Sequence, residues 1–203
     1  MIGMTSSPNP AFALSRRDAV KALLADRKDT LVVTGLGSAS YDVHAAGDRD
    51  DNYYLWGAMG AAALVGLGLA QAQPKKTVLV VTGDGEQLMA FGSLATIAVA
   101  KARNLVIAVI DNGHFGETGM QTSHTGRGLN FADVAASCGF AHTATLTRIE
   151  EVKDLARGLG GAAEGPSLFV IKVAAENPPR SLPPRDAVFI KNRFRTSLDL
   201  APT

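Results

Sequence analysis

The chain has few of the residues that form covalent or metal cross-links. Its one cysteine, Cys138, excludes a disulfide framework and leaves too few thiols for a cysteine-bound iron–sulfur cluster. Its four histidines are scattered and show no zinc-binding spacing. These absences suit a reducing compartment, and we expect a cytoplasmic protein.

Membrane-spanning length and strong net charge are also absent. The segment 57–70 is apolar almost throughout, but its 14 residues are too few to cross a bilayer. The N-terminus lacks a basic region followed by an apolar core, so no signal peptide is expected. The net charge is +1, which gives no reason to expect a nucleic-acid partner.

The residues that are present predict one α/β domain. A chain of 203 residues with 46% hydrophobic content can bury a full core. Buried-type strands alternate with helical segments, which predicts a doubly wound, mostly parallel sheet with helices on both faces. We expect an N-terminal arm at 1–14, the domain at 15–176 and a C-terminal extension at 177–203. The predicted strands are 31–34, 78–81, 105–110, 141–146 and 167–173, and the predicted helices are 15–26, 57–70, 88–98, 130–137 and 147–159.

Polar residues predict where several helices start. Ser15 is placed to cap the first helix, with Asp18 three residues later forming an approximate capping box. Asn130 is placed to cap the helix that follows it. Thr147 and Glu150 have the spacing of a capping box for the last predicted helix of the domain.

The stretch from 78 to 116 carries the clearest chemical signal. Gly83, Asp84 and Gly85 form a sharp turn after one predicted strand, and Asn112 follows the next strand after 26 intervening residues. Adjacent parallel strands would place Asp84 and Asn112 at the same carboxyl edge, where ligands bind in open α/β folds. Their oxygens suit Mg²⁺, which takes few protein ligands plus phosphate oxygens. The alternative is two ordinary turns, since Asp and Asn tolerate turn geometry.

A second glycine-rich turn, residues 35–40, follows the first predicted strand. It is only half of a dinucleotide fingerprint, because the third glycine and the acidic residue about 20 positions later are missing. Nicotinamide binding is therefore not expected.

The Gly-Asp-Gly turn with Asn112 at this distance resembles the cofactor motif of thiamine diphosphate enzymes. The segment Tyr53-Tyr54-Leu55-Trp56-Gly57-Ala58-Met59-Gly60 is similar to the part of pyruvate decarboxylases and acetolactate synthases that supports the aminopyrimidine ring. The resemblance covers roughly residues 31–173 and corresponds to the diphosphate-binding (PP) domain of the family. The motif departs from the family pattern at Asp111, where asparagine is commoner.

The resemblance implies roles for individual residues. Asp84, Asn112 and the main-chain carbonyl of His114 would hold Mg²⁺. Met59 would force the cofactor into its bent conformation, and the Gly57 carbonyl would accept a hydrogen bond from its amino group. Glu117 and Thr118 would lie over the thiazolium ring. Further cofactor contacts are implied for Gly37, Ser38, Gly83, Gly85, Glu86, Gly113 and Phe115.

The loop that carries these residues is long for a connection in a compact domain, which favours a functional role. Gln121 and His124 of this loop could line a substrate pocket, and the alternative for His124 is a histidine on a surface loop.

The resemblance also implies a partner. In this family a glutamate on a separate pyrimidine-binding (PYR) domain activates the cofactor, and a chain of one α/β unit has no room for that domain. We therefore expect a PYR-domain (α) subunit that carries the glutamate, in an α2β2 or larger heteromer. Among split-subunit families, the chain is most similar to the β subunit of sulfopyruvate decarboxylases and the C-terminal half of phosphonopyruvate decarboxylases. Decarboxylation of a small 2-oxo acid with a second anionic group is implied.

Several alternatives remain at this level. The same motif serves acetolactate synthase-like carboligases, β subunits of 2-oxo acid oxidoreductases, and a cofactor-binding subunit that has lost catalysis.

Residues 177–184 carry four prolines and should be irregular. The basic and apolar residues of 189–195 alternate, which fits either a solvated edge strand or partner contact, or an anion site for the substrate's extra acidic group.

Overall fold

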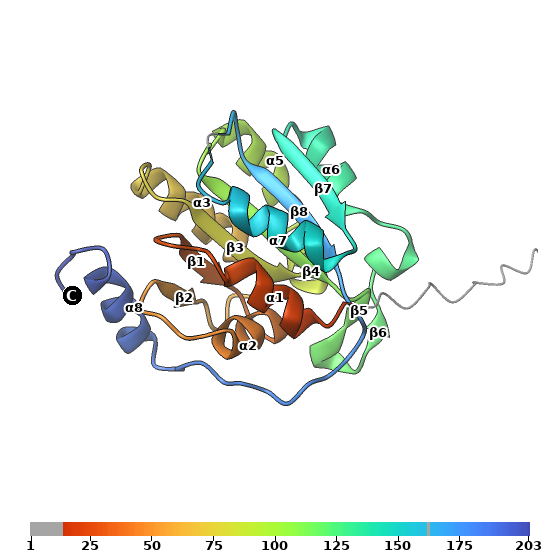
Figure 1. Cartoon of the computed structure of the whole chain (residues 1–203), viewed down its shortest axis with the longest axis horizontal. Helices are drawn as coiled ribbons and strands as arrows, with labels where there is room; N and C mark the ends of the chain where they lie inside the picture. The colour runs from red at the N-terminus through yellow and green to blue at the C-terminus, as the bar shows by residue number, and fades with distance from the viewer. Residues whose placement is uncertain (1–13, 162) are drawn as a thin grey trace, which may run out of the picture.

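A parallel sheet forms the centre of the fold in the computed structural model, which describes residues 14–161 and 163–203 (Figure 1). Nearly all of the expected N-terminal arm lies outside the described residues. Within the described chain the large sheet has six strands in the order β2-β1-β3-β4-β8-β7, and every neighbouring pair is parallel. The strands are β1 (Leu31–Thr34), β2 (Asn52–Tyr54), β3 (Val78–Gly83), β4 (Leu105–Asp111), β7 (His142–Leu146) and β8 (Ser167–Lys172).

Helices cover both faces of this sheet, as the strand–helix alternation predicts. Alternate strand residues point to opposite faces, so Val33 and Val80 pack in one core while Val32 and Leu79 pack in the other. The first core lies under α3 (Ala62–Ala72), α5 (Ser93–Ala100) and α6 (Phe131–Cys138). The second lies under α1 (Arg16–Leu24), α2 (Ser38–Ala45) and α7 (Ile149–Gly158), which face the viewer in Figure 1. The doubly wound α/β prediction is confirmed.

Three features of the predicted element pattern are wrong. The helix predicted over 88–98 is two helices, α4 (Asp84–Met89) and α5, because the chain leaves helical geometry at Ala90. The helix predicted from Gly57 begins only at Ala62, since Gly57 and Gly60 have φ of +77° and +92°, which interrupts a right-handed helix. Strand β2 lies within a segment for which no strand was predicted.

The predicted helix caps have mixed outcomes. The cap at Asn130 is confirmed, because its side-chain oxygen accepts from the Ala132 amide at 2.9 Å. The Ser15 capping box is wrong: Ser15 makes no side-chain cap bond, and the Arg16 amide donates to Glu176 Oε1 at 3.1 Å instead. At α7 the accepting carboxylate is that of Glu151 rather than Glu150.

The C-terminal extension runs back across the domain to the β2 edge of the sheet (Figure 1). Its proline-rich part is irregular, as predicted, and hydrogen bonds from residues of α1, α2 and the β2–α3 segment are among those that hold it. Arg17 donates to the Pro179 carbonyl at 2.8 Å, His44 Nδ1 lies 2.7 Å from Ser181 Oγ, and Trp56 Nε1 donates to the Pro184 carbonyl at 2.7 Å.

The basic tail forms a helix, α8 (Ala187–Thr196), so the edge-strand interpretation is wrong. Asp186 caps α8 through bonds from the amides of Val188 (2.9 Å) and Phe189 (3.1 Å), and Ile190 and Phe194 face inward. Arg193 pairs with Asp48 at 2.7 Å, and α8 packs on β2. None of the described tail residues lines the pocket described below.

Candidate functional site

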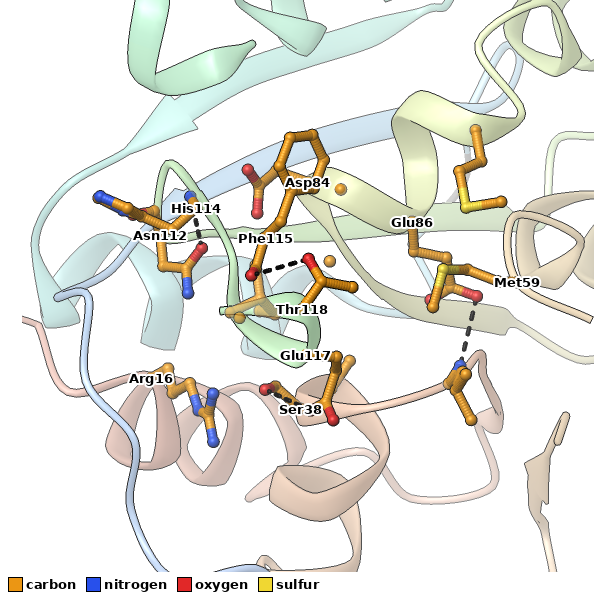
Figure 2. A pocket seen from close by; sticks show the side chains of 17 residues that line it. Arg16, Ser38, Met59, Asp84, Glu86, Asn112, His114, Phe115, Glu117 and Thr118 are labelled. Carbon is orange, nitrogen blue, oxygen red and sulfur yellow. Dashed lines mark hydrogen bonds between the residues drawn. The ribbon is translucent and has the colours of Figure 1, made fainter. Parts of the chain in front are cut away.

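A pocket of about 220 Å³ opens at the carboxyl ends of β3 and β4 (Figure 2). The parallel register pairs Gly83 of β3 with Ile110 of β4, so the turns that follow the two strands lie side by side. Asp84, from the first turn, and Asn112, from the second, both line the pocket. The predicted convergence of these two side chains at one sheet edge is therefore present in the structure.

Asp84 is a buried carboxylate held by hydroxyl groups. It is 3% exposed, and its Oδ2 accepts from Ser123 Oγ at 2.5 Å and lies 2.9 Å from Thr125 Oγ1. Burial, together with the negative charge of Asp111, raises the pKa of Asp84. Asp111 in turn forms an ion pair with Lys172. A cation next to Asp84 would relieve the repulsion between these carboxylates, so this electrostatic setting favours metal binding.

The turn after β4 is fixed by its own hydrogen bonds. The Asn112 side-chain oxygen accepts from the His114 amide at 2.9 Å, and the Asn112 carbonyl lies 2.8 Å from His114 Nδ1. Gly113 adopts φ of +69°, and its carbonyl accepts from the Ser123 amide at 2.8 Å. A side chain at Gly126 would approach that carbonyl to 2.6 Å, so the loop segments are in direct backbone contact here. The turn that carries Asn112 is therefore held in place by the second half of the same loop.

The donor set suits Mg²⁺ bound together with a phosphate. The described residues contain no group of three or more His, Cys, Asp or Glu side chains able to hold a metal by themselves. One carboxylate, one amide oxygen and main-chain carbonyls make an incomplete oxygen shell. Mg²⁺ commonly completes such a shell with water and phosphate oxygens.

Glu86 joins the strand turns to two other loops. Its carboxylate accepts from the amides of Leu36 at 3.4 Å and Gly60 at 3.3 Å, and from Thr82 Oγ1 at 2.9 Å. Burial raises the pKa of this carboxyl group. A Cβ added to Gly35 would lie 1.6 Å from Glu86 Oε1, so only glycine fits beside it. Glu86 thus sets the spacing between the loop of Ser38 and the loop of Met59.

The opposite wall comes from a small hairpin of β5 (His114–Phe115) and β6 (Gln121–Thr122), joined by the 3₁₀ turn η1 (Gly116–Thr118). Glu117 lies 3.5 Å from Ser38 Oγ and 3.2 Å from Arg180 Nη2, so this wall meets the start of α2 and the C-terminal extension. A Cβ at Gly85 would lie 2.8 Å from the Phe115 ring, which explains glycine at that position.

The pocket brings together eleven of the residues that the sequence singled out and leaves five outside its lining. Gly37 and Gly113 are chain neighbours of lining residues, and Gly57 lies two positions before Met59. Gln121, in β6, does not line the pocket. His124 lies apart, in a separate surface hollow, with its ring centre 6.3 Å from that of Phe115. The geometry thus favours the surface-loop interpretation of His124. The eleven lining residues are Ser38, Met59, Gly83, Asp84, Gly85, Glu86, Asn112, His114, Phe115, Glu117 and Thr118.

Sequence reasoning missed one chemically important lining residue, Arg16. A signal was present in the first helix. Arg16 shares a helical stripe with Ala19, Val20 and Leu23, all of which are buried. That spacing places a guanidinium on the inward face of α1, where a charged group requires a partner.

Comparisons with known proteins agree with this geometry. Residues 36–173 match the family model described as thiamine pyrophosphate enzyme, C-terminal TPP binding domain. The chain belongs to this family of thiamine pyrophosphate (thiamine diphosphate) enzymes. The matched span contains every pocket-lining residue except Arg16.

Two groups of relatives are similar to this thiamine diphosphate-binding domain. The sulfopyruvate decarboxylase subunit beta of Methanocaldococcus jannaschii is 37% identical over 67% of this chain and 72% of its own length. The corresponding subunit of Methanococcus maripaludis is 30% identical over 91% of this chain and 98% of its own. The phosphonopyruvate decarboxylase of Streptomyces viridochromogenes is 40% identical over 78% of this chain, which spans only 40% of that longer protein.

Solved structures confirm the fold at low sequence identity. Benzoylformate decarboxylase from Polynucleobacter necessarius has a TM-score of 0.70 at 18% identity, over 87% of this chain and 36% of that one. The 2-oxoglutarate:ferredoxin oxidoreductase from Magnetococcus marinus has a TM-score of 0.65 at 18% identity, over 97% of this chain and 81% of that one. Among the described residues, no helix has the length and apolar character needed to span a membrane.

Proposed function

We propose that this chain is the diphosphate-binding (β) subunit of a thiamine diphosphate-dependent decarboxylase. Its substrate would be a 2-oxo acid with a second anionic group, of the sulfopyruvate or phosphonopyruvate kind, and its products an aldehyde and CO2. The observation that carries this proposal is the convergence of Asp84 and Asn112 on one pocket at the carboxyl edge of β3 and β4. The similarity to sulfopyruvate and phosphonopyruvate decarboxylases supports the substrate class.

In this proposal the chain holds the cofactor through its diphosphate. Asp84, Asn112 and the His114 carbonyl are the proposed Mg²⁺ ligands. Burial and the negative charge of Asp111 raise the pKa of Asp84, and a cation bound at this carboxylate would favour its ionised form. Gly83, Gly85 and Gly113 leave room for close backbone approach to phosphate. When bound, thiamine diphosphate would supply a nucleophilic carbon for the 2-oxo group and a thiazolium ring able to accept the electrons left by CO2.

Other residues of the pocket would orient and enclose the reacting groups. Met59 projects into the pocket with 37% of its surface exposed, which suits an apolar support for the ring system. Glu117 and Thr118 lie on the η1 turn of the opposite wall (Figure 2), where they could contact the substrate. Glu86 would act by holding the Ser38 and Met59 loops at a fixed separation.

The proposal includes a partner subunit. The name of the M. jannaschii and M. maripaludis relatives, subunit beta, implies that those proteins have another subunit. We propose that a PYR-domain (α) chain supplies the activating glutamate and the second half of the cofactor site, in an α2β2 or larger heteromer. This chain would then require that partner for activity.

The test is calorimetric titration of Mg²⁺ and thiamine diphosphate into this chain alone and into its complex with the candidate partner. Binding by the complex, with release of CO2 and an aldehyde from sulfopyruvate, is expected. Asp84→Ala should abolish both binding and activity, whereas Asp133→Ala, an exposed acid on α6, should change neither. Full activity in Asp84→Ala would refute the metal role. An acetolactate-type product from pyruvate would instead indicate the carboligase.

A further inference from the structure

Arg16 places a buried positive charge at the wall of the pocket. The residue is 3% exposed, and it is the one arginine or lysine among the described residues that line the cavity. Figure 2 shows its side chain leaving α1 on the side that faces Ser38. The other ionisable lining groups include three carboxylates, those of Asp84, Glu86 and Glu117. An anionic ligand entering this pocket therefore meets mostly negative protein charge, and Arg16 is the exception.

The positive charge of Arg16 is only partly neutralised by its neighbours. Its Nε lies 2.8 Å from Asp42 Oδ2, and the other oxygen of Asp42 accepts from Arg17 Nε at 3.2 Å. Asp42 is fully buried, so two guanidinium groups share one carboxylate and the cluster keeps a net charge of +1. The Nη1 atom of Arg16 is buried and has no hydrogen-bond partner among the described residues. A buried donor without a partner is costly, and a bound oxygen ligand would remove that cost.

The start of α2 adds neutral donors on the same side of the pocket. The first amides of this helix, which begins at Ser38, have no intrahelical partners, and no side-chain cap bonds to them. Both Ser38 and Ala39 line the cavity. Free amides at a helix start attract anions, and a nearby guanidinium strengthens the attraction. A guanidinium with an unpartnered nitrogen near uncapped amides suits one tetrahedral oxyanion.

We propose that Arg16 is an oxyanion-binding residue of this pocket, with its guanidinium donating to an oxygen of a phosphate-, phosphonate- or sulfonate-type group. The inference rests on the proposed function, which supplies two sources of that chemistry. One is the terminal phosphate of the cofactor, and the other is the second anionic group of the substrate. Either source would give Arg16 the hydrogen bond that the described chain does not provide.

The experiment compares Arg16→Met with Arg17→Met. Arg17 contacts the same carboxylate but does not line the pocket, so its variant controls for loss of a bond to Asp42. The double variant Arg16→Met/Asp42→Asn is a second test. It covers the case in which the single change leaves the buried Asp42 carboxylate short of a cation and the chain does not fold. Each protein is assembled with the partner and titrated with Mg²⁺ and thiamine diphosphate. Each isolated chain is titrated with Mg²⁺ and inorganic diphosphate, and KM is measured for sulfopyruvate and pyruvate.

If Arg16 binds the cofactor phosphate, its variants should bind thiamine diphosphate and inorganic diphosphate about tenfold or more weakly, as expected for loss of a charge-assisted bond. If Arg16 binds the substrate, KM for sulfopyruvate should rise by a similar factor, while KM for pyruvate and the cofactor Kd stay unchanged. Arg17→Met should show neither effect.

Wild-type values for every constant in a folded Arg16 variant would overturn the inference. Failure of the wild-type complex to bind thiamine diphosphate would refute the proposed function instead. In that case Arg16-dependent binding of inorganic diphosphate would still support an oxyanion site, and its absence would overturn the site as well.

Discussion

Replacing Glu86 tests whether one buried carboxylate sets the shape of the cofactor site. Glu86 is 6% exposed and accepts three hydrogen bonds, from Leu36, Gly60 and Thr82. At about 1 kcal/mol each, loss of these bonds in Glu86→Ala should cost about 3 kcal/mol of unfolding free energy. For a chain of this size, about 2–4 °C per kcal/mol gives a melting temperature lower by about 6–12 °C.

Thermal unfolding of the free chain, followed by circular dichroism or calorimetry, measures this effect. Glu86→Gln keeps the shape and one acceptor oxygen, and the Thr82 hydroxyl can reverse its role, so its cost should stay within about 1 kcal/mol. Glu164→Ala, an exposed loop glutamate, is the matched control and should shift stability by at most about 0.5 kcal/mol.

A substitution at Gly35 tests the same Glu86 carboxylate from the loop that packs against it. A methyl group at Gly35 would lie 1.6 Å from Glu86 Oε1, so Gly35→Ala must displace the carboxylate. Gly35→Ala should therefore weaken thiamine diphosphate binding by the assembled complex in the same direction as Glu86→Ala. The reasoning is refuted if Glu86→Ala melts like Glu164→Ala, or if Glu86→Gln is as damaging as Glu86→Ala.

Three further changes give direct readouts. Lys172→Met should lower the unfolding free energy by about 3 kcal/mol in urea, because it leaves Asp111 buried without its cation; the double variant with Asp111→Asn should recover part of this loss. Burial opposes the ionisation of Asp48, but hydrogen bonds from Arg193 and Tyr54 prevail and lower its pKa, so its stabilisation is present above about pH 4 and lost as pH falls through the lowered value. The gap in melting temperature between wild type and Asp48→Asn should accordingly be wide at pH 7 and shrink on acidification. Asn130→Ala removes the cap of α6 and should cost about 1 kcal/mol by thermal unfolding, and an unchanged midpoint would show that α6 does not depend on it.

Much of the fold could be predicted because buried parallel strands leave a local signature. The runs at Leu31, Val78, Leu105 and Ser167 are continuous and apolar, and each is a strand within a residue or two of the predicted bounds. β2 was missed because an edge strand of three residues carries too little pattern. The edge strand was one of the interpretations open for 189–195, because alternating basic and apolar residues suit a strand as well as a helix, α8, that buries only Ile190 and Phe194.

The sequence by itself determined the turns at Asp84 and Asn112 and their position at one sheet edge. The spacing along the chain and the right-handed crossover rule leave few ways to arrange the two strands that precede these turns. Tertiary structure alone decided which distant groups complete the site. Arg16 comes from the first helix, and Glu86 bonds to amides 50 and 26 residues earlier in the chain. Lys172 of β8 pairs with Asp111 of the neighbouring strand β4. Such contacts depend on how helices pack on the sheet, where side-chain direction and burial, rather than sequence spacing, select the partner.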